Sequence, residues 1–139
     1  MNKRERKSWP ETAMFLAESI ASLRSEDPYI QVGACVIHKS KKISLGYNGP
    51  PPSIEVDYSD RDARRYYMLH AEANVLDTCE PGEIDIMAVT HLPCSDCLKR
   101  ISKYKIEKVF YKNDNYASVN IDKSIEMAKF LNIQLIKIK

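Results

Sequence analysis

Two short stretches of this 139-residue chain combine residue types that bind metal ions and move protons. The first is His70-Ala71-Glu72, and the second is Pro93-Cys94-Ser95-Asp96-Cys97. One imidazole and two thiolates suit Zn²⁺, and three protein ligands leave its fourth tetrahedral position open, as in catalytic zinc sites. The two stretches therefore predict a zinc site that is held by His70, Cys94 and Cys97 and is open for chemistry.

Glu72 is the candidate proton carrier of this site. It lies two residues after His70, too close for both to bind one ion comfortably from a helix start, yet near enough to reach water at the open position. The Cys94 and Cys97 pair is expected at a helix N-terminus, where unpaired N–H groups lower the pKa of a thiol and favour metal binding. The arrangement therefore indicates catalysis with Glu72 as the acid and base.

The cysteines also allow less specialised alternatives. Cys94 and Cys97 alone would fit a redox pair in a thioredoxin-like unit, or half of a structural zinc site. A structural site with three thiolates would need Cys35 or Cys79, which the sequence places in an apolar strand and at a helix end, as core residues. The His-x-Glu stretch that begins at His70 favours the catalytic zinc site over these alternatives.

The neighbours of the other two histidines predict different surroundings. His38 follows a strand on a lysine-rich turn, which predicts a solvated surface position. His91 lies two residues before Pro93, so it either lines the pocket beside the metal ligands or is an ordinary loop histidine. The basic residues at 3–7 are expected to form a solvated end of the chain, and Tyr66-Tyr67 is expected to contribute to packing.

Length, composition and charge limit the class of protein. Hydrophobic residues make up 44% and charged residues 29%, which predicts a single domain over 1–139 with its core over about 9–139. The formal charge of +2 disfavours nucleic-acid binding through a broad basic face and leaves an anionic small molecule open. Because no apolar stretch approaches the roughly 18 residues of a bilayer span, we expect a cytoplasmic protein without a membrane partner.

Hydrophobic periodicity predicts alternating helices and strands, and hence a three-layer α/β domain with a mixed sheet: a hairpin at one end and parallel strands joined by helices at the other. The polar stretch between Pro50 and Leu69 is expected to be a functional or partly helical loop, such as a lid or a subunit contact. One helix is expected to begin at the capping box Ser8-Trp9-Pro10-Glu11. Three further helices are expected over 70–78, 94–104 and 121–131. The expected strands cover 32–37, 43–47, 84–90, 106–111 and 133–138.

These motifs resemble those of the zinc-dependent cytidine and deoxycytidylate deaminase superfamily, and within it the deoxycytidylate (dCMP) deaminases. His-x-Glu followed by Pro-Cys-x-x-Cys is the signature of zinc nucleobase deaminases. The resemblance runs from about Trp9 to the C-terminus and implies a three-layer α/β/α cytidine-deaminase-like fold with a mixed five-stranded sheet. It is carried further by the stretches at 23–28, 31–35, 46–49, 70–74 and 109–111.

The reaction that this resemblance implies is hydrolysis of dCMP to dUMP and ammonia, which supplies dUMP for thymidylate synthesis. Zn²⁺ on His70, Cys94 and Cys97 would provide hydroxide at neutral pH for attack on cytosine C4. Glu72 would carry the water proton to N3 and later protonate the departing amine. The alternatives are a zinc deaminase of another base (tRNA adenosine, a free nucleoside or a purine base) and a non-catalytic, zinc-stabilised nucleic-acid-binding module.

Substrate contacts are implied at four further positions. Asn48 would bond the sugar 3′-OH, the Ala71 backbone N–H would hold the pyrimidine carbonyl, and Tyr116 would border the sugar or base. Arg24 is the candidate for the 5′-phosphate, because a planar guanidinium matches phosphate oxygens bidentately. The alternatives are a surface arginine at a helix end for Arg24, and a left-handed turn residue before Gly49 for Asn48.

Regulation and assembly are also implied by the resemblance. Relatives are activated by dCTP and inhibited by dTTP, and many are homohexamers. In many relatives, a loop that contains a Gly-Cys segment and acidic residues helps bind those effectors. This chain has Pro50-Pro51-Pro52-Ser53 there instead. Because this loop has no cysteine, an additional structural zinc is not expected.

Overall fold

The computed structural model describes residues 2–116 and 119–139. The predicted alternation of helices and strands is confirmed, and α2 is an addition within the polar stretch after Pro50, which the sequence predicted to be functional or partly helical. The elements are α1 (Trp9–Arg24), β1 (Gly33–His38), β2 (Ile43–Tyr47), α2 (Arg61–Tyr67), α3 (Ala71–Leu76), β3 (Ile84–His91), α4 (Ser95–Ser102), β4 (Lys108–Asn113), α5 (Ile121–Phe130) and β5 (Gln134–Lys137).

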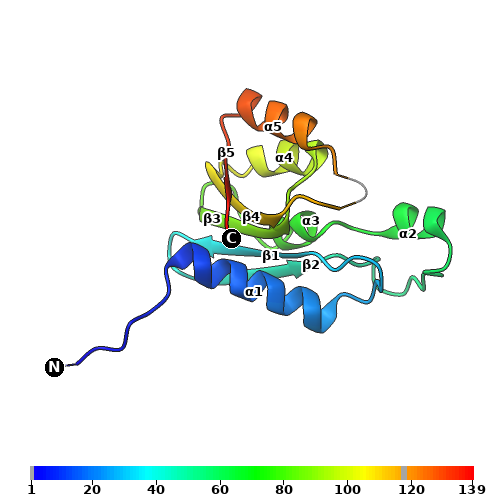
Figure 1. The fold of residues 1–139 in the computed structure, drawn as a ribbon, viewed down its shortest axis with the longest axis horizontal. Coiled ribbons are helices and arrows are strands. Elements are labelled where there is room, and N and C mark those ends of the chain that lie inside the picture. Colours follow the sequence, from blue (N-terminus) through cyan, green and yellow to red (C-terminus); the bar gives the residue numbers. More distant parts are fainter. Residues whose placement is uncertain (1, 117–118) are drawn as a thin grey trace.

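The five strands form one mixed sheet in the order β2-β1-β3-β4-β5. β1 pairs antiparallel with both β2 and β3, whereas β3, β4 and β5 run parallel to one another. Figure 1 shows α4 and α5 with the parallel half of the sheet and α1 along the hairpin half. This is the predicted combination of a hairpin at one end and helical crossovers at the other.

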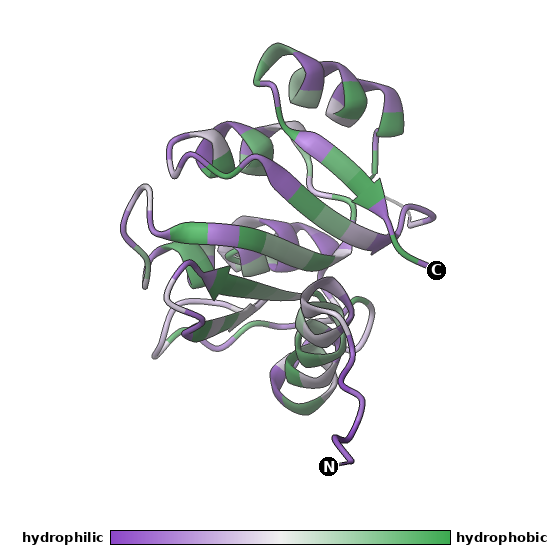
Figure 2. Cartoon of the chain, turned by 90° about the vertical axis from the view of Figure 1, so that its left-hand side faces the viewer, coloured by the Kyte–Doolittle hydropathy of each residue, from purple (hydrophilic) through white to green (hydrophobic). Residues whose placement is uncertain are grey.

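Two apolar cores lie on the two faces of the sheet. The alternation of side chains along β1 divides its residues between them: Ala34 and Val36 face one core, and Cys35 and Ile37 face the other. The first core is closed by α3, α4 and α5, and the second by α1. Figure 2 shows the largely apolar strands of the sheet between helices that combine hydrophilic and hydrophobic residues. The fold is therefore the predicted three-layer α/β/α arrangement.

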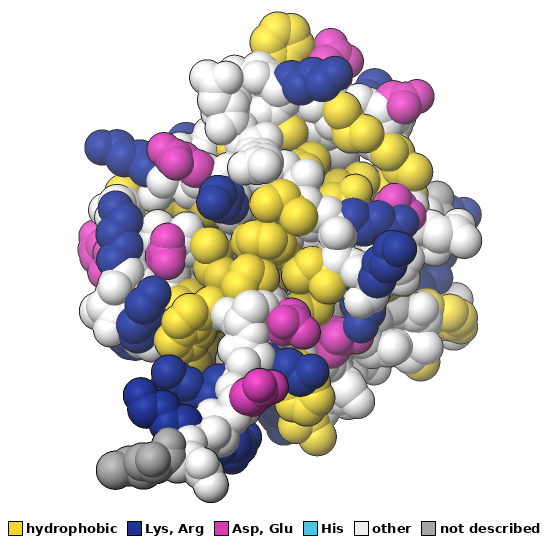
Figure 3. Space-filling model, turned by 60° about the vertical axis from the view of Figure 1, so that its left-hand side comes forward, with side chains coloured by type: hydrophobic (Ala, Val, Ile, Leu, Met, Phe, Trp, Pro, Cys, Tyr) yellow, Lys and Arg dark blue, Asp and Glu magenta, His cyan; other side chains and the backbone are white. Residues whose placement is uncertain are grey.

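The helix α1 begins at the predicted capping box. The Ser8 hydroxyl accepts a hydrogen bond from the Glu11 backbone N–H at 3.2 Å and donates one to the Glu11 carboxylate at 2.9 Å. The core beneath α1 is incompletely covered, since Leu16, Ile136 and Ile138 pack against it while they remain partly exposed. Figure 3 shows apolar side chains reaching the surface in the middle of the face drawn there, among Lys, Arg, Asp and Glu side chains.

The predicted solvated position of His38 is wrong. Its side chain is buried, because β1 continues to this residue in the middle of the sheet, between β2 and β3. The two ring nitrogens find partners there: Nδ1 lies 3.2 Å from Glu83 Oε1, and Nε2 lies 2.8 Å from Ser44 Oγ. The tertiary pairing of strands therefore overrides the polar turn that follows in the sequence.

The predicted packing role of Tyr66-Tyr67 is also wrong. Tyr66 is 81% exposed, and the two rings contact each other edge to face at a centroid distance of 4.9 Å. All seven residues of α2 are partly or fully exposed, so this helix offers no core for the rings to join.

Among the described residues, no helix is long and apolar enough to cross a membrane.

Candidate active site

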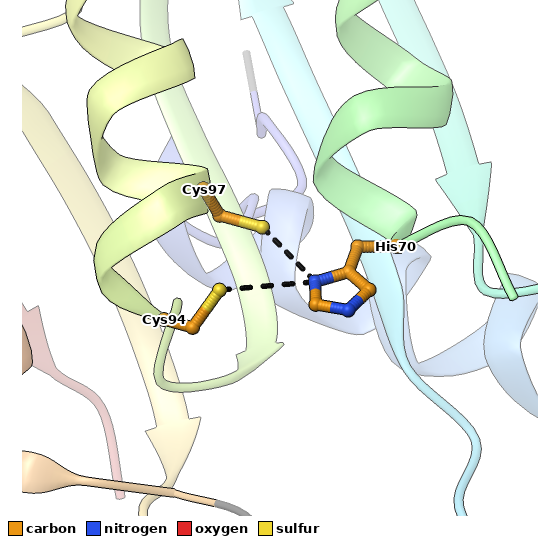
Figure 4. A group of neighbouring side chains, drawn as sticks. All are labelled: His70, Cys94 and Cys97. Carbon is orange, nitrogen blue, oxygen red and sulfur yellow. Dashed lines mark hydrogen bonds between the residues drawn. The ribbon is translucent and has the colours of Figure 1, made fainter. Parts of the chain in front are cut away.

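The three predicted metal ligands lie at the N-termini of two neighbouring helices. His70 is the N-cap residue of α3, Cys94 is the N-cap residue of α4, and Cys97 lies in the first turn of α4. Figure 4 shows the His70 ring turned toward both sulfur atoms. Its Nδ1 atom lies 3.2 Å from Cys97 Sγ and 3.8 Å from Cys94 Sγ.

These distances fit a tetrahedral zinc ion. With Zn–S of about 2.3 Å and Zn–N of about 2.0 Å, tetrahedral ligand atoms lie roughly 3.5 to 3.8 Å apart. The three donor atoms of His70, Cys94 and Cys97 lie within 4.8 Å of one another, and the two nitrogen–sulfur distances bracket that spacing. The donor set, with one imidazole and two thiols, therefore fits Zn²⁺ without rearrangement of the backbone.

The charges of the two cysteines are coupled. Hydrogen bonds from the Cys97 thiol and from His70 together lower the pKa of Cys94 to about 4, although burial opposes this shift. The same contact with Cys94 raises the pKa of Cys97. The hydrogen bond with Cys94 also raises the pKa of His70. The site thus stabilises a thiolate, the form of cysteine that binds metals.

Glu72 lies beside these donors in the first turn of α3 and is 4% exposed. Burial raises the pKa of its carboxyl group, because the charged form loses its hydration. A carboxyl group whose pKa is raised toward the neutral range can both accept and release a proton. The placement therefore suits the predicted acid and base role.

Close packing of β2 against α3 fixes the position of this helix. A Cβ atom at Gly46 would lie 2.6 Å from the Val75 backbone nitrogen and 2.8 Å from the Ala71 carbonyl oxygen. The Asn74 side chain joins the same strand and helix, since it donates a hydrogen bond to the Tyr47 carbonyl at 2.8 Å. Only glycine at position 46 therefore lets the strand approach the helix that carries Glu72.

A cavity of about 1020 Å³ opens at this site. His70, Glu72 and Cys94 line it together with three of the predicted substrate residues, namely Asn48, Ala71 and Tyr116. Arg24 lies elsewhere, at the exposed C-terminal end of α1. The fold therefore gathers residues from distant parts of the chain around one space.

Asn48 is buried at the cavity wall, and the structure excludes the left-handed turn as its role. It is not among the described residues with positive φ. Its Oδ1 atom accepts hydrogen bonds from Ser25 Oγ at 2.6 Å and from the Val32 N–H at 2.8 Å. Its Nδ2 atom donates to the Ile30 carbonyl at 3.0 Å, which uses one of the two amide N–H donors. These contacts hold the amide in one orientation.

Tyr116 and His91 form a second part of the wall. The Tyr116 hydroxyl donates a hydrogen bond to the Leu92 carbonyl, and its ring meets the His91 ring edge to face at 5.2 Å. His91 Nδ1 lies 2.7 Å from Thr90 Oγ1. Burial lowers the pKa of His91 and favours its neutral form. The sequence predicted either a pocket-lining histidine or an ordinary loop histidine, and His91 lines the pocket.

Three arginines of α2 also line the cavity, and the sequence analysis predicted no role for them. Arg64 and Arg65 lie three and four residues after Arg61, which places all three on one side of α2. That spacing was visible in the sequence. Their position at the cavity depends on the path of the loop before Leu69, which no local pattern specifies.

A second group of metal-binding residue types consists of His38, Cys79 and Glu83. Hydrogen bonds within the protein account for these side chains: the two ring nitrogens contact Glu83 and Ser44, and the Cys79 thiol donates to the Val75 carbonyl at 3.3 Å. The cysteine is buried, as the sequence predicted. This group therefore serves the core between α3 and the sheet.

Comparison with known proteins identifies the family. Residues 7–113 match the family model described as the cytidine and deoxycytidylate deaminase zinc-binding region. The chain belongs to this family. Deoxycytidylate deaminase of Mus musculus is 33% identical over 119 residues, which cover 78% of this chain and 66% of the mouse protein. A probable deoxycytidylate deaminase of Drosophila melanogaster is 32% identical over 120 residues, covering 74% of this chain and 59% of that protein.

A crystal structure of the same family shows the same fold. The dCMP deaminase of cyanophage S-TIM5, in complex with dCMP and dUMP, aligns with a TM-score of 0.75 and 30% identity over 92% of this chain and 95% of that chain. This likeness confirms the predicted cytidine-deaminase-like fold, and the zinc-binding family model confirms Zn²⁺ as the cofactor. The chain spans just under two thirds of the length of the mouse deaminase that it matches.

Proposed function

We propose that this domain hydrolyses dCMP to dUMP and ammonia. The observation that carries the proposal is the set His70, Cys94 and Cys97 at zinc-ligand spacing, with the buried carboxyl group of Glu72 beside it in one cavity. The similarity to deoxycytidylate deaminases, including one whose structure contains dCMP and dUMP, supports the choice of substrate.

The catalytic roles follow from the chemistry of these side chains. His70 through Nδ1, Cys94 and Cys97 hold the zinc ion. When bound, zinc supplies Lewis-acid activation of water at neutral pH. Glu72 accepts a proton from the attacking water and passes it to N3 of the pyrimidine. It then takes the second proton from the hydroxyl group on C4 and gives it to the amine, which leaves C4 as ammonia. Its burial keeps bulk water from competing for the proton.

The cavity wall orients the substrate. The Ala71 N–H lies in the first turn of α3, where backbone N–H groups have no partner within the helix, and it holds the pyrimidine carbonyl. The Asn48 amide, fixed by its three hydrogen bonds, offers its second N–H to the sugar 3′-OH. Tyr116 borders the sugar or base. Arg24 stays a candidate for the 5′-phosphate, although its position at the end of α1 is exposed.

The regulation and assembly implied by the family also belong to this proposal. We retain dCTP as activator, dTTP as inhibitor, a homohexamer and a cytoplasmic location as predictions. Supply of dUMP for thymidylate synthesis is the corresponding metabolic role.

Ammonia release by the purified, zinc-loaded protein tests the reaction. We expect turnover of dCMP, with lower kcat/KM for CMP and deoxycytidine and no turnover of a tRNA stem-loop; added dCTP tests regulation in the same assay. Turnover of the stem-loop, or equal turnover of deoxycytidine and dCMP, would replace the proposed substrate. Silence on every substrate, with nucleic-acid binding that depends steeply on salt, would favour a non-catalytic module.

A further inference from the structure

Beyond the residues already assigned, the cavity has a basic wall. Arg61, Arg64 and Arg65 line it from α2, and Figure 1 shows this helix set apart from α3 and α4, whose N-termini carry the zinc donors. A molecule that reaches from the zinc donors toward α2 would therefore meet a reactive site and a cationic wall in the same cavity.

Arg64 is the most enclosed of the three arginines, and part of its guanidinium lacks a partner. Its Nε atom is buried without a hydrogen-bond partner among the described residues, whereas the other two arginines are exposed. The guanidinium carbon lies 4.0 Å from the centre of the Tyr29 ring. Stacking on an aromatic ring orients the planar group and leaves its N–H donors directed outward at the ring's edge. An unpaired buried donor is costly, so this site suits an acceptor supplied by a ligand.

The arginines of α2 also form no ion pair with any described residue, although Asp60 and Asp62 lie in the first turn region of the same helix. In the described part of the chain, the five ion pairs all use Lys or His as the cation, and none includes an arginine of α2. Three like charges on one side of a short helix repel one another. Asp27 also lines the cavity, but its carboxylate accepts the Tyr29 backbone N–H at 2.8 Å. An anion is the ligand that would relieve this repulsion.

Three contacts tie the α2 segment to the rim of the cavity. The Tyr58 hydroxyl donates to Glu26 Oε1 at 2.5 Å, Gly49 pairs with Leu69 through two backbone hydrogen bonds, and Arg64 stacks on Tyr29. These contacts lie before, after and within α2. They hold the arginines at the cavity even though α2 contributes nothing to the core.

We propose that Arg64, supported by Arg61 and Arg65, is the residue that binds the 5′-phosphate of the substrate, and that α2 therefore accounts for the preference for dCMP over deoxycytidine that the proposed function expects. A phosphate monoester carries close to two negative charges at neutral pH and accepts bidentate hydrogen bonds from guanidinium groups. This inference rests on the proposed function, because the base of the same molecule occupies the zinc end of the cavity. It assigns the phosphate to α2 rather than to Arg24.

Steady-state kinetics with dCMP and deoxycytidine test the assignment in the zinc-loaded protein. For Arg64→Ala we expect the ratio of kcat/KM for dCMP to that for deoxycytidine to fall by about 10- to 100-fold, the effect of losing a charged hydrogen-bond pair. Arg64→Lys should recover only part of the ratio, because an ammonium cannot form the bidentate pair. Arg100→Ala, which removes an exposed arginine on α4, is the matched control and should leave the ratio unchanged.

The same variants give a clear negative result. A ratio unchanged in Arg64→Ala but lowered in Arg24→Ala would move the phosphate to the end of α1. An equal loss of activity on both substrates in Arg64→Ala would show a structural role only. Either outcome overturns the proposal.

Calorimetric binding of dUMP and deoxyuridine separates this inference from the proposed reaction, since it needs no turnover. We expect the wild-type protein to bind dUMP more tightly than deoxyuridine, and Arg64→Ala to lose that preference. If the wild-type protein shows this preference but deaminates nothing, the reaction is wrong and the phosphate site stands. If it binds both molecules equally, the phosphate site is wrong whatever the turnover.

Discussion

The zinc-donor site and the α2 segment share a cavity but differ in how they are held. The donors sit on α3 and α4, which bury residues such as Val75 and Leu98 in the main core. The arginines sit on a seven-residue helix with no buried side chain, tied to the rim by a few polar and stacking contacts. The chemistry is thus built on the rigid part of the fold and the proposed phosphate recognition on its periphery.

This difference follows from what each task requires. Three metal ligands must keep their spacing within a fraction of an ångström, which only packed elements with locked rotamers provide. A phosphate is recognised by charge and by several interchangeable oxygens, so it tolerates a less firmly held partner. Segments with few buried contacts also open at a lower free-energy cost, which suits a part of the wall that a substrate must pass.

The largest expected effect is at the rigid site. Cys97→Ala removes a buried residue that we propose as a zinc ligand, and we expect the loss of bound zinc and of all measurable ammonia release. Metal analysis of the purified protein, with an expected one zinc per wild-type chain, measures the first effect. Cys35→Ala is the matched control, because Cys35 is buried in the core beneath α1. This variant should therefore bind zinc as the wild-type protein does. Full zinc content in Cys97→Ala would remove this residue from the ligand set.

Next in size is the loss of Glu72, the proposed proton carrier. Glu72→Gln keeps the shape of the side chain but cannot exchange the proton, so turnover should fall by at least the ~10²- to 10⁴-fold that general acid–base catalysis contributes. Zinc content and thermal stability should stay near the wild-type values. Measurement of kcat in the ammonia assay decides the matter, and near-normal turnover would exclude Glu72 from the reaction.

The sequence predicted the rigid region well because its signals are local. His70, Glu72, Cys94 and Cys97 stand in two short motifs whose residue types have few other uses in this pattern, and apolar periodicity marks the elements around them. The described structure brings three of these side chains to zinc-ligand spacing. The alternation of helices and strands also predicted a mixed sheet with a hairpin at one end and parallel strands at the other, which the structure confirms.

The remaining features depend on contacts between distant parts of the chain. His38 was expected in solvent, yet it is buried by its contacts with Ser44 and Glu83, and the latter comes from beyond α3. The basic wall depends on Tyr29 and on the path of the loop that carries Arg64, neither of which a local pattern reveals. Sequence motifs thus predicted the side chains that the fold brings together as potential metal ligands, whereas the proposed phosphate site emerged only from the folded chain.

The smallest expected effect concerns the N-cap of α2. The Asp60 carboxylate accepts hydrogen bonds from the backbone N–H groups of Asp62 and Ala63. Asp60→Ala should destabilise the helix locally by about 1 kcal/mol, a typical value for the loss of an N-cap. Because α2 lies outside the core, we expect faster hydrogen exchange of its amides, a severalfold higher KM for dCMP and no change in the melting temperature.

Asn120→Ala sharpens the comparison, because Asn120 caps α5 through a hydrogen bond from the Lys123 N–H at 3.1 Å. This helix buries Ser124 and Ala128 against the rest of the fold, so the same loss of a cap should lower the global melting temperature. If both variants lowered the melting temperature equally, α2 would unfold together with the core, and the contrast between a rigid catalytic region and a separately held phosphate wall would fail.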